Sequence, residues 1–428
     1  MSLAPGAVTN EPRSDIPTEA PAGPAGRFGP RFAAAARRFG PALGVYALVK
    51  SAGFAVFMYL LHFSADYRSR VPGMGGGKRP WDVVGSWDGL AYQEVAAHWY
   101  HPQVLAAGAQ VSDVKPNTAA FFPLYSGLMR LLSKATGLGP YGSGMAVSVV
   151  FSFVAAAGIY AVVTLWLSTR MSEQAARRAG TATAGLWALA PGSGVEWAVY
   201  TESLFVAIAA WACYHVMKRQ WVAAGLLALV SGLNRPTSAA LIAGVGLAAL
   251  IALLKRTDGV AKPLFAILVS PWGMVGYILW VGHKMHNLGG YFLIQKSWNH
   301  YFDGGKFTLK AIPEIMIARH HYLWAWPVSD TFALLVLLTV PVLLVMMLRL
   351  RPPAFLVVFV LLTIASTVLS QQLFCNIPRY LLPAFPLLVA PGILVSRLKW
   401  PTMLAVLVFV GAVSGWYAGY LTFELGTP

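Results

Sequence analysis

Residues 143–168, SGMAVSVVFSFVAAAGIYAVVTLWLS, contain no charged side chain and are long enough to cross a lipid bilayer as one helix. Similar apolar runs recur along the whole chain of 428 residues, of which 57% are hydrophobic and only 11% are charged. Ordinary soluble domains contain about 25% charged residues. The composition therefore predicts an all-α polytopic membrane protein.

Each apolar run predicts one transmembrane helix, which gives about eleven helices in total. Two of the runs, 179–190 and 220–233, are shorter than the ~20 residues that a straight crossing needs. Either they borrow flanking residues, or they end early around a cavity that opens outward, where protein or water covers non-helical backbone. The predicted spans lie near residues 41–63, 143–168, 179–190, 198–217, 220–233, 237–254, 263–282, 331–349, 354–371, 380–396 and 401–421.

Basic residues give the chain its net charge of +16 and indicate how it threads the membrane. When the N-terminus is placed in the cytoplasm, short basic clusters fall on every turn that then lies inside, as the positive-inside rule requires. The excess charge is therefore assigned to topology and to anionic lipid heads rather than to nucleic acid. The clusters are Arg37/Arg38, Arg170/Arg177/Arg178, Lys218/Arg219, Lys255/Arg256/Lys262, Arg349/Arg351 and Arg397/Lys399.

The chain is expected to consist of a disordered cytoplasmic tail, residues 1–40, and a transmembrane domain, residues 41–428. The tail is rich in Pro, Ala and Gly and lacks the apolar run of a cleaved signal. Compact loops and a short tail favour a bacterial plasma membrane. With this threading, two long segments, 64–140 and 283–330, lie outside the membrane.

The first outer loop carries Trp87 and Asp88, followed by Tyr92. A carboxylate is costly to hold at the edge of lipid, so Asp88 is expected to have a function. Aromatic faces beside a carboxylate suit a sugar ring, and the carboxylate can take the proton of a hydroxyl that attacks a carbon atom. Aromatic residues are also ordinary anchors at a membrane surface. Asp82, in the same loop, remains an alternative base.

The loop closes on an amphiphilic run, FFPLY at residues 121–125, that is expected to lie along the membrane surface. Its aromatic side chains join those near the carboxylates as candidates for a sugar or acceptor pocket. The candidates are Trp87, Tyr92, Phe122, Tyr125 and Tyr200.

A Pro/Gly-rich turn, residues 191–197, comes before the sequence Tyr200-Thr201-Glu202-Ser203. The turn breaks the chain at the outer surface. Glu202 then falls in the first turns of the next helix, where an unpaired carboxylate is costly. One alternative places Glu202 and Tyr200 at the mouth of an outward-facing cavity. In the other, Thr201 and Ser203 cap and pack the helix, and a neighbouring arginine satisfies Glu202.

Two arginines, Arg235 and Arg379, lie at the outer ends of spans, each next to a proline. A guanidinium offers a planar fork of donors that fits phosphate oxygens, although a single membrane arginine also snorkels to the surface. The outer segment 283–330 adds basic residues, among which Lys296 and His300 are candidates to bind the same phosphate.

The sequence predicts neither a metal centre nor another cofactor. Adjacent His320 and His321 point to different faces of a helix, and no carboxylate lies at ligand spacing from them. Cys213 and Cys375 fall in separate apolar runs and are expected to be ordinary buried thiols.

Several short motifs, taken in order, resemble the PIG-V-type (GPI mannosyltransferase 2-like) mannosyltransferases, which add the second mannose in GPI-anchor assembly and have bacterial relatives. The resemblance spans most of residues 41–396. It implies a GT-C-type glycosyltransferase, a many-spanning membrane enzyme that takes a sugar, typically mannose, from polyprenyl phosphate on the extracytoplasmic face without a metal. The motifs are SWDG (86–89), AFFPLY (120–125), YTESLF (200–205), LNR (233–235) and PRYLLP (378–383).

Carried over to this sequence, the resemblance implies that Asp88 is the general base and that Glu202 is the acid of the family's Ser/Thr-Glu-Ser element. The two arginines are then expected to hold the donor phosphate while an acceptor hydroxyl, on a glycolipid or another glycan, attacks with inversion. Two other classes stay open. One is a flippase or transporter of lipid-linked sugars, and the other is a non-catalytic partner that binds lipid-linked glycans.

Overall fold

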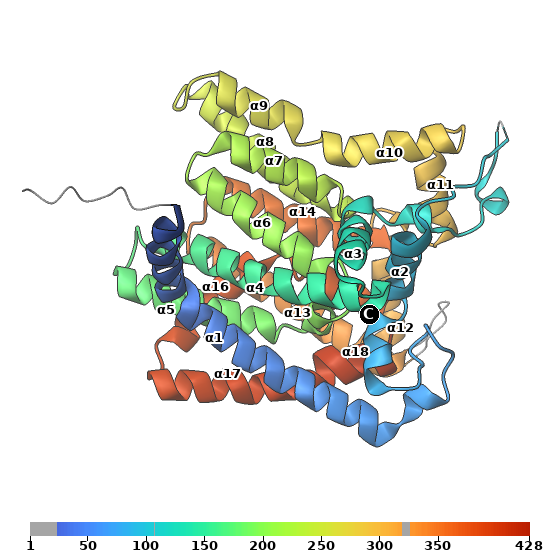
Figure 1. The fold of residues 1–428 in the computed structure, drawn as a ribbon, viewed down its shortest axis with the longest axis horizontal. Helices are drawn as coiled ribbons and strands as arrows, with labels where there is room; N and C mark the ends of the chain where they lie inside the picture. Colours follow the sequence, from blue (N-terminus) through green and yellow to red (C-terminus); the bar gives the residue numbers. More distant parts are fainter. Residues whose placement is uncertain (1–23, 107, 319–325) are drawn as a thin grey trace, which may run out of the picture. The chain divides into compact units, whose positions relative to one another are not determined.

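The computed structural model describes residues 24–106, 108–318 and 326–428, most of which are helical (Figure 1). The chain divides into two compact units, residues 1–40 and 41–428. The α-helices are α1 (Pro24–Ser64), α2 (Asp88–His98), α3 (Pro123–Thr136), α4 (Pro140–Leu167), α5 (Glu173–Ala188), α6 (Glu202–Met217), α7 (Trp221–Gly232), α8 (Ala239–Leu254), α9 (Ala261–Val269), α10 (Trp272–Lys284), α11 (Gly290–Ser297), α12 (Lys306–Met316), α13 (Pro327–Arg349), α14 (Ala354–Val368), α15 (Ile377–Tyr380), α16 (Val389–Ser396), α17 (Trp400–Ser414) and α18 (Leu421–Glu424).

Short helical turns and two strands connect these helices. The strands β1 (Tyr301–Phe302) and β2 (Ser370–Gln371) pair antiparallel and join the long segment 283–330 to the chain just before α15. The connecting turns include the 3₁₀-helices η2 (Pro80–Gly85), η5 (Ser193–Trp197), η6 (Pro236–Ser238), η7 (Phe374–Asn376) and η8 (Phe385–Leu388).

The all-α polytopic class is confirmed, because each predicted run contains a helix and most of its residues are helical. Within the described residues, the stretches long and apolar enough to cross a membrane are five, and a pair of helices bent by 76° is a sixth candidate. Four further apolar helices are shorter, so eleven crossings remain a prediction. The five stretches are Ala36–Ser64, Pro140–Leu167, Ala261–Lys284, Pro327–Arg349 and Trp400–Glu424, and the bent pair is Phe374–Tyr380 with Phe385–Ser396.

The two short predicted runs behave differently. The run at 179–190 borrows residues on its N-terminal side, because α5 starts at Glu173, where the Ser172 side chain caps it by accepting the Ala175 amide at 3.3 Å. Helix α7 stays short and ends at Gly232. The helix cannot continue into η6, because Arg235, which precedes Pro236, is extended with φ −167° and ψ 157°.

Helix α1 begins at Pro24 and therefore includes residues 24–40, which the sequence assigned to a disordered tail. An alanine-rich stretch explains this difference, because alanine has the highest helix propensity. Residues 1–23, the rest of the predicted tail, lie outside the described residues.

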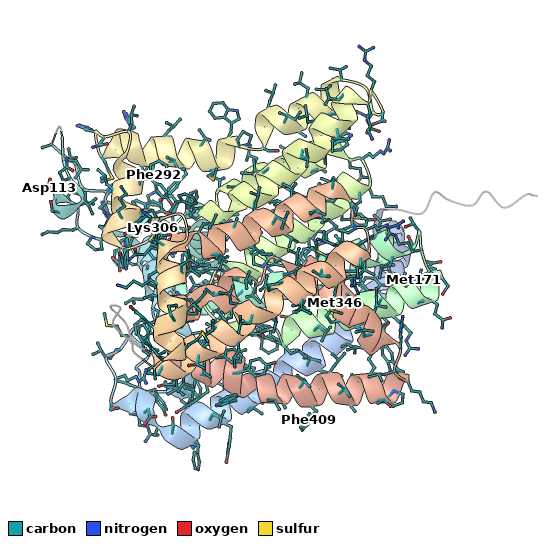
Figure 2. All side chains as sticks on the ribbon, turned by 180° about the vertical axis from the view of Figure 1, so that it is seen from behind. Asp113, Met171, Phe292, Lys306, Met346 and Phe409 are labelled. Carbon is teal, nitrogen blue, oxygen red and sulfur yellow. The ribbon has the colours of Figure 1, made fainter. Side chains whose placement is uncertain are left out.

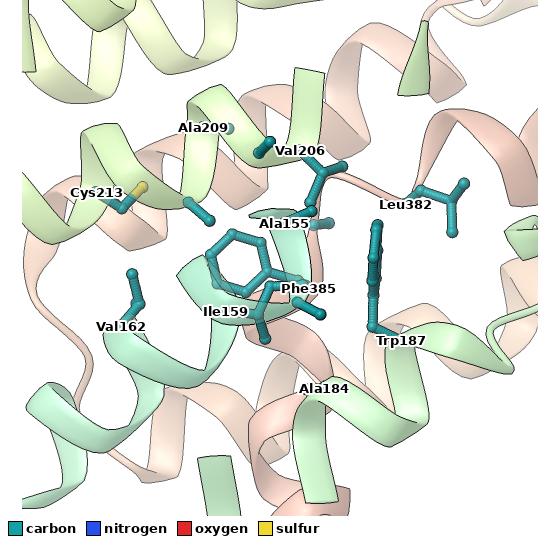
Figure 3. Packing of buried hydrophobic residues seen from close by; sticks show 14 of the residues in the cluster. Ala155, Ile159, Val162, Ala184, Trp187, Val206, Ala209, Cys213, Leu382 and Phe385 are labelled. Carbon is teal, nitrogen blue, oxygen red and sulfur yellow. The ribbon is translucent and has the colours of Figure 1, made fainter. Parts of the chain in front are cut away.

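Small side chains allow the central helices of the second unit to pack closely. Ala155 and Ile159 of α4 and Ala209 of α6 belong to one buried cluster, which also contains the rings of Trp187 and Phe385 (Figure 3). All five side chains are buried. Close packing of small residues is the usual means of holding helices together in lipid, where the hydrophobic effect gives no driving force.

The periphery of the second unit is apolar, as lipid contact requires. Phe409 of α17 points away from the helices and is 70% exposed (Figure 2). Asp113 and Lys306 lie at one end of this unit and Met171 at the other (Figure 2). The loops predicted to face opposite sides of the membrane therefore lie at opposite ends.

Candidate active site

Four charged side chains from four stretches of the chain meet near the first residues of α2 and α6. Arg379 of α15 donates from Nη2 to Asp88 Oδ2 at 2.8 Å, and its Nε lies 3.2 Å from Glu202 Oε1. Arg235, directly before η6, donates to the same Glu202 oxygen at 2.8 Å. The structure thus brings together the two predicted acids and the two predicted arginines.

Burial separates the roles of these four side chains. The side chain of Glu202 is 1% exposed, those of Arg379 and Arg235 are 5% and 8% exposed, and that of Asp88 is 32% exposed. Glu202 is therefore buried and pairs with both arginines, which is the arrangement that the second of the two alternatives for this residue describes. Arg379 also donates from Nη1 to Pro428 O at 2.5 Å. Asp88 is the member of the cluster that a ligand can reach.

Aromatic rings frame both guanidiniums. The Arg379 guanidinium lies 5.2 Å from the ring centroid of Tyr200 and 4.8 Å from that of Tyr380, whose hydroxyl accepts from Arg379 Nη2 at 3.1 Å. The Arg235 guanidinium lies 5.6 Å from the Tyr380 ring and 5.8 Å from that of Phe205. Such cation–π contacts fix the planes of both guanidiniums. Tyr380 was not predicted as a site residue, although its place directly after Arg379 was a usable signal.

Two glycines let the backbone segments of the site approach one another. A Cβ on Gly192 would lie 2.5 Å from Pro378 O and 2.6 Å from Arg379 Cα, so the predicted turn at 191–197 rests directly on the backbone of α15. A Cβ on Gly89 would lie 3.2 Å from Val199 O. This second contact brings the backbone of Val199 close to the residue that follows Asp88.

Trp87, the residue before Asp88, has a strained backbone with φ +60° and ψ −124°. Its amide donates to Gly73 O at 2.8 Å, which holds it there. Such a conformation costs about 1–3 kcal/mol for a residue other than glycine, and strain of this kind is concentrated at functional sites. The strain sets the direction in which α2, and with it Asp88, begins.

Several buried polar atoms on or beside the cluster have no hydrogen-bond partner among the described residues. Buried polar groups are almost always paired in native proteins, so a group of exceptions indicates a place for water or a polar ligand. These atoms are Trp87 Nε1, Glu202 Oε2, Asn234 Oδ1 and His300 Nε2.

The two predicted basic side chains of the segment 283–330 add no charge to the cluster. The ring of His300 lies 5.9 Å from that of Tyr380, and burial, together with the charge of Arg379, lowers the pKa of His300 to about 4. His300 is therefore neutral at pH 7 and can take part only as a hydrogen-bonding group. Lys296 is exposed on α11, and no described contact joins it to the arginines. His320 and His321 lie outside the described residues.

Most of the aromatic residues predicted to line a pocket are instead buried and pack the helices around the site. Phe122 is 1% exposed and packs on Tyr277 with ring centroids 4.5 Å apart, and Tyr125 is fully buried beneath Tyr92. These three side chains do not line an open pocket, because large rings on the inner faces of α2 and α3 are used to pack those helices together. The Tyr92 hydroxyl lies 3.4 Å from Thr201 Oγ1 and links α2 to the residue before Glu202.

Asp82, the alternative base, has a structural role. Its Oδ2 accepts the backbone amides of Lys78 and Arg79, each at 2.9 Å, and so closes the turn that begins η2. No described contact joins it to either arginine of the cluster. Asp88 is therefore the better-placed carboxylate.

Both cysteines are free and buried, as expected. Within the described ranges, no group of three or more His, Cys, Asp or Glu side chains is arranged to hold a metal ion.

No protein-family model matches the chain, and no curated protein matches it. Among solved structures, the crystal structure of ArnT from Cupriavidus metallidurans bound to undecaprenyl phosphate is similar, with a TM-score of 0.49 and 15% sequence identity. The similarity covers 86% of this chain and 64% of that one, so the chain spans less than two thirds of the neighbour's length.

Proposed function

We propose that the protein is a GT-C-type membrane glycosyltransferase that moves a sugar, mannose, from a polyprenyl-phosphate donor to an acceptor hydroxyl. The observation that carries the proposal is the position of Arg379, which lies between a partly exposed carboxylate, Asp88, and a fully buried one, Glu202. The motif resemblance supports the choice of donor and sugar. The reaction is placed on the extracytoplasmic face of a bacterial plasma membrane, in agreement with the pattern of basic clusters.

The donor phosphate is assigned to Arg379 and Arg235. Their charges are balanced by Asp88 and Glu202, so an incoming phosphate must compete with one of the carboxylates. Asp88 is the one that gives way, because it is 32% exposed whereas Glu202 is 1% exposed and contacts both arginines. A phosphate oxygen then takes the place of Asp88 Oδ2 on Arg379 Nη2.

The replacement of Asp88 by phosphate on Arg379 frees Asp88 to act as the general base. Once Arg379 Nη2 binds phosphate, Asp88 Oδ2 is available to accept the proton of the acceptor hydroxyl. The hydroxyl oxygen forms a bond to the anomeric carbon, and the bond from that carbon to the phosphate oxygen breaks on the opposite face, which inverts the configuration. The electron pair stays on the leaving phosphate, and both guanidiniums stabilise its charge.

The test is an assay of the purified protein with radiolabelled polyprenyl-phosphate-mannose and a panel of glycolipid acceptors. We expect label to move to an acceptor. Asp88→Asn should lower the rate about 10²- to 10⁴-fold without loss of fold, because the side chain is partly exposed.

The matched control is Glu94→Gln on the same helix. Glu94 is 56% exposed and, within the part of the chain that the structure describes, pairs with His98 at 3.0 Å, so this variant should keep the wild-type rate. A folded Asp88→Asn protein with normal transfer would contradict the assignment. Movement of the donor across liposomes without transfer would indicate a flippase, and binding alone would indicate a non-catalytic partner.

A further inference from the structure

A second buried ion pair lies outside the charged cluster. Lys50 Nζ, on α1, is 3.3 Å from Glu196 Oε2, in η5, and the two side chains are 6% and 0% exposed. Tyr46, one turn earlier on α1, donates to the same oxygen at 2.9 Å. The Lys50 ammonium also donates to the carbonyl of Ser193, the first residue of η5. Helix α1 therefore contacts η5 at two of its residues, Ser193 and Glu196.

Such a pair is costly to build. Two buried charges lose their hydration, and well-packed apolar residues of the same size are often as stable or more stable. Burial raises the pKa of Glu196 to about 7 even though Lys50 opposes this shift. Ionisable residues buried within membrane domains usually serve a function. The contribution of this pair to the stability of the fold therefore does not by itself explain why the two charges are buried.

The contacts of η5 indicate what the pair acts on. Gly192, directly before η5, rests on the backbone of Pro378 and Arg379 with no room for a Cβ. At the other end of the turn, Ser203 Oγ, beside Glu202 on α6, donates to Glu196 O at 2.9 Å. One turn thus contacts the backbone of Arg379 and the residue next to Glu202.

We propose that Lys50, Tyr46 and Glu196 form a brace that fixes η5. Through η5, the brace positions Arg379 to bind the phosphate of a polyprenyl-phosphate ligand, and it also positions Glu202, the carboxylate that holds both arginines. The three residues of the brace are positioning residues, because none of them contacts the arginine side chains. The ligand class rests on the function proposed above, whereas the mechanical coupling rests on the contacts of η5 alone.

The test compares a double variant with its single variants. Lys50→Met alone leaves Glu196 buried without its cation and should fold poorly. Lys50→Met combined with Glu196→Gln removes both charges and should melt close to the wild type. We nevertheless expect this double variant to bind polyprenyl phosphate in detergent micelles about tenfold more weakly. Lys50→Arg, which keeps the charge, should restore most of the affinity when Glu196 is present.

A second measurement does not depend on the ligand. Hydrogen exchange of the amides in residues 376–382 should be faster in the double variant than in the wild type, because the turn under α15 is loosened. The control is the exposed pair of Arg177 and Glu173 on α5, 2.6 Å apart, replaced by Met and Gln. This control should change neither the affinity nor the exchange.

The two measurements separate the two proposals. A double variant with wild-type exchange at residues 376–382 and wild-type affinity overturns the brace. If the wild type does not bind polyprenyl phosphate, the ligand class is wrong, and faster exchange in the double variant still supports the brace.

Discussion

Arg379 donates hydrogen bonds from its two Nη atoms to three acceptors, Asp88 Oδ2, Tyr380 Oη and Pro428 O. Glu202 lies against its Nε at 3.2 Å. Lysine cannot replace this arrangement, because a single ammonium lacks the planar fork that reaches several acceptors in one plane. The phosphate binding proposed for this site would therefore depend on the shape of the guanidinium as well as on its charge.

Asp82→Asn tests whether Asp82, the alternative base, is needed for sugar transfer. The change weakens the acceptor for the Lys78 and Arg79 amides, so we expect the protein to lose about 1 kcal/mol of stability, the usual effect of losing a cap. Transfer activity of the folded protein should stay near the wild type. A loss of activity comparable to that of Asp88→Asn, with the melting temperature unchanged, would restore Asp82 as the base.

His300 gives the stability of the protein a defined pH dependence. Its pKa is about 4 in the folded state and about 6.5 when unfolded. Between these values the unfolded state binds more protons, so the stability contributed by neutral His300 is present above pH 6.5 and is lost as the pH falls towards 4. Thermal melts from pH 7 to pH 4 should show a smaller decrease for His300→Gln than for the wild type.

The control for this measurement is His98→Gln, which replaces an exposed histidine on α2 and should follow the wild-type curve. Parallel melting curves for His300→Gln and the wild type would show that His300 is not buried as described.

Candidate site residues were predictable from the sequence where a charged residue lies at the end of a helix or beside a residue that interrupts one. Asp88, Glu202, Arg235 and Arg379 each have this property, which is visible in the sequence. The difference between Asp88 and Glu202 was not visible, because it depends on burial. Tyr380 was missed although it follows Arg379 directly. Its contact with the second guanidinium, that of Arg235, is visible only in the folded chain.

Among the helices and turns, the contact between η5 and α15 is the most sensitive to change. Gly192→Ala places a methyl group 2.5 Å from Pro378 O, so one backbone must move. We expect a loss of about 1–3 kcal/mol of stability, as for overpacking in a core, together with weaker binding of polyprenyl phosphate. Thermal unfolding and a binding titration measure the two effects.

Gly246→Ala on α8 is the matched control. A Cβ at this position meets nothing within 4 Å, and alanine is a better helix former than glycine, so stability should stay level or rise. Equal stability of the two alanine variants would show that the turn and α15 are not in contact.

Elements with long apolar sequences were predictable, whereas the helices of the segment 283–330 were not. Helix α12 is stabilised by tertiary packing, with Ala311 and Ile315 buried against Leu334 of α13. Its sequence also contains Pro313, which argues against a helix interior when it is considered alone. Packing against a distant helix overrides this local preference.

For the whole molecule, the predicted threading leads to a labelling experiment. Ser112 and Thr257 are exposed and lie in loops predicted to face opposite sides of the membrane. In intact cells, a membrane-impermeant maleimide should label Ser112→Cys and leave Thr257→Cys unlabelled. The native Cys213 and Cys375 are buried and should give little background. The reverse pattern would place the charged cluster on the cytoplasmic side.

The position of Pro428 has a practical consequence for anyone who purifies this protein. Its carbonyl oxygen touches Arg379, so an affinity tag fused after it starts within reach of the guanidinium. A polyhistidine or acidic epitope placed there would crowd the very group whose ligand is sought. A tag or fluorescent fusion attached directly after Pro428 therefore needs a protease site that is cleaved before any assay.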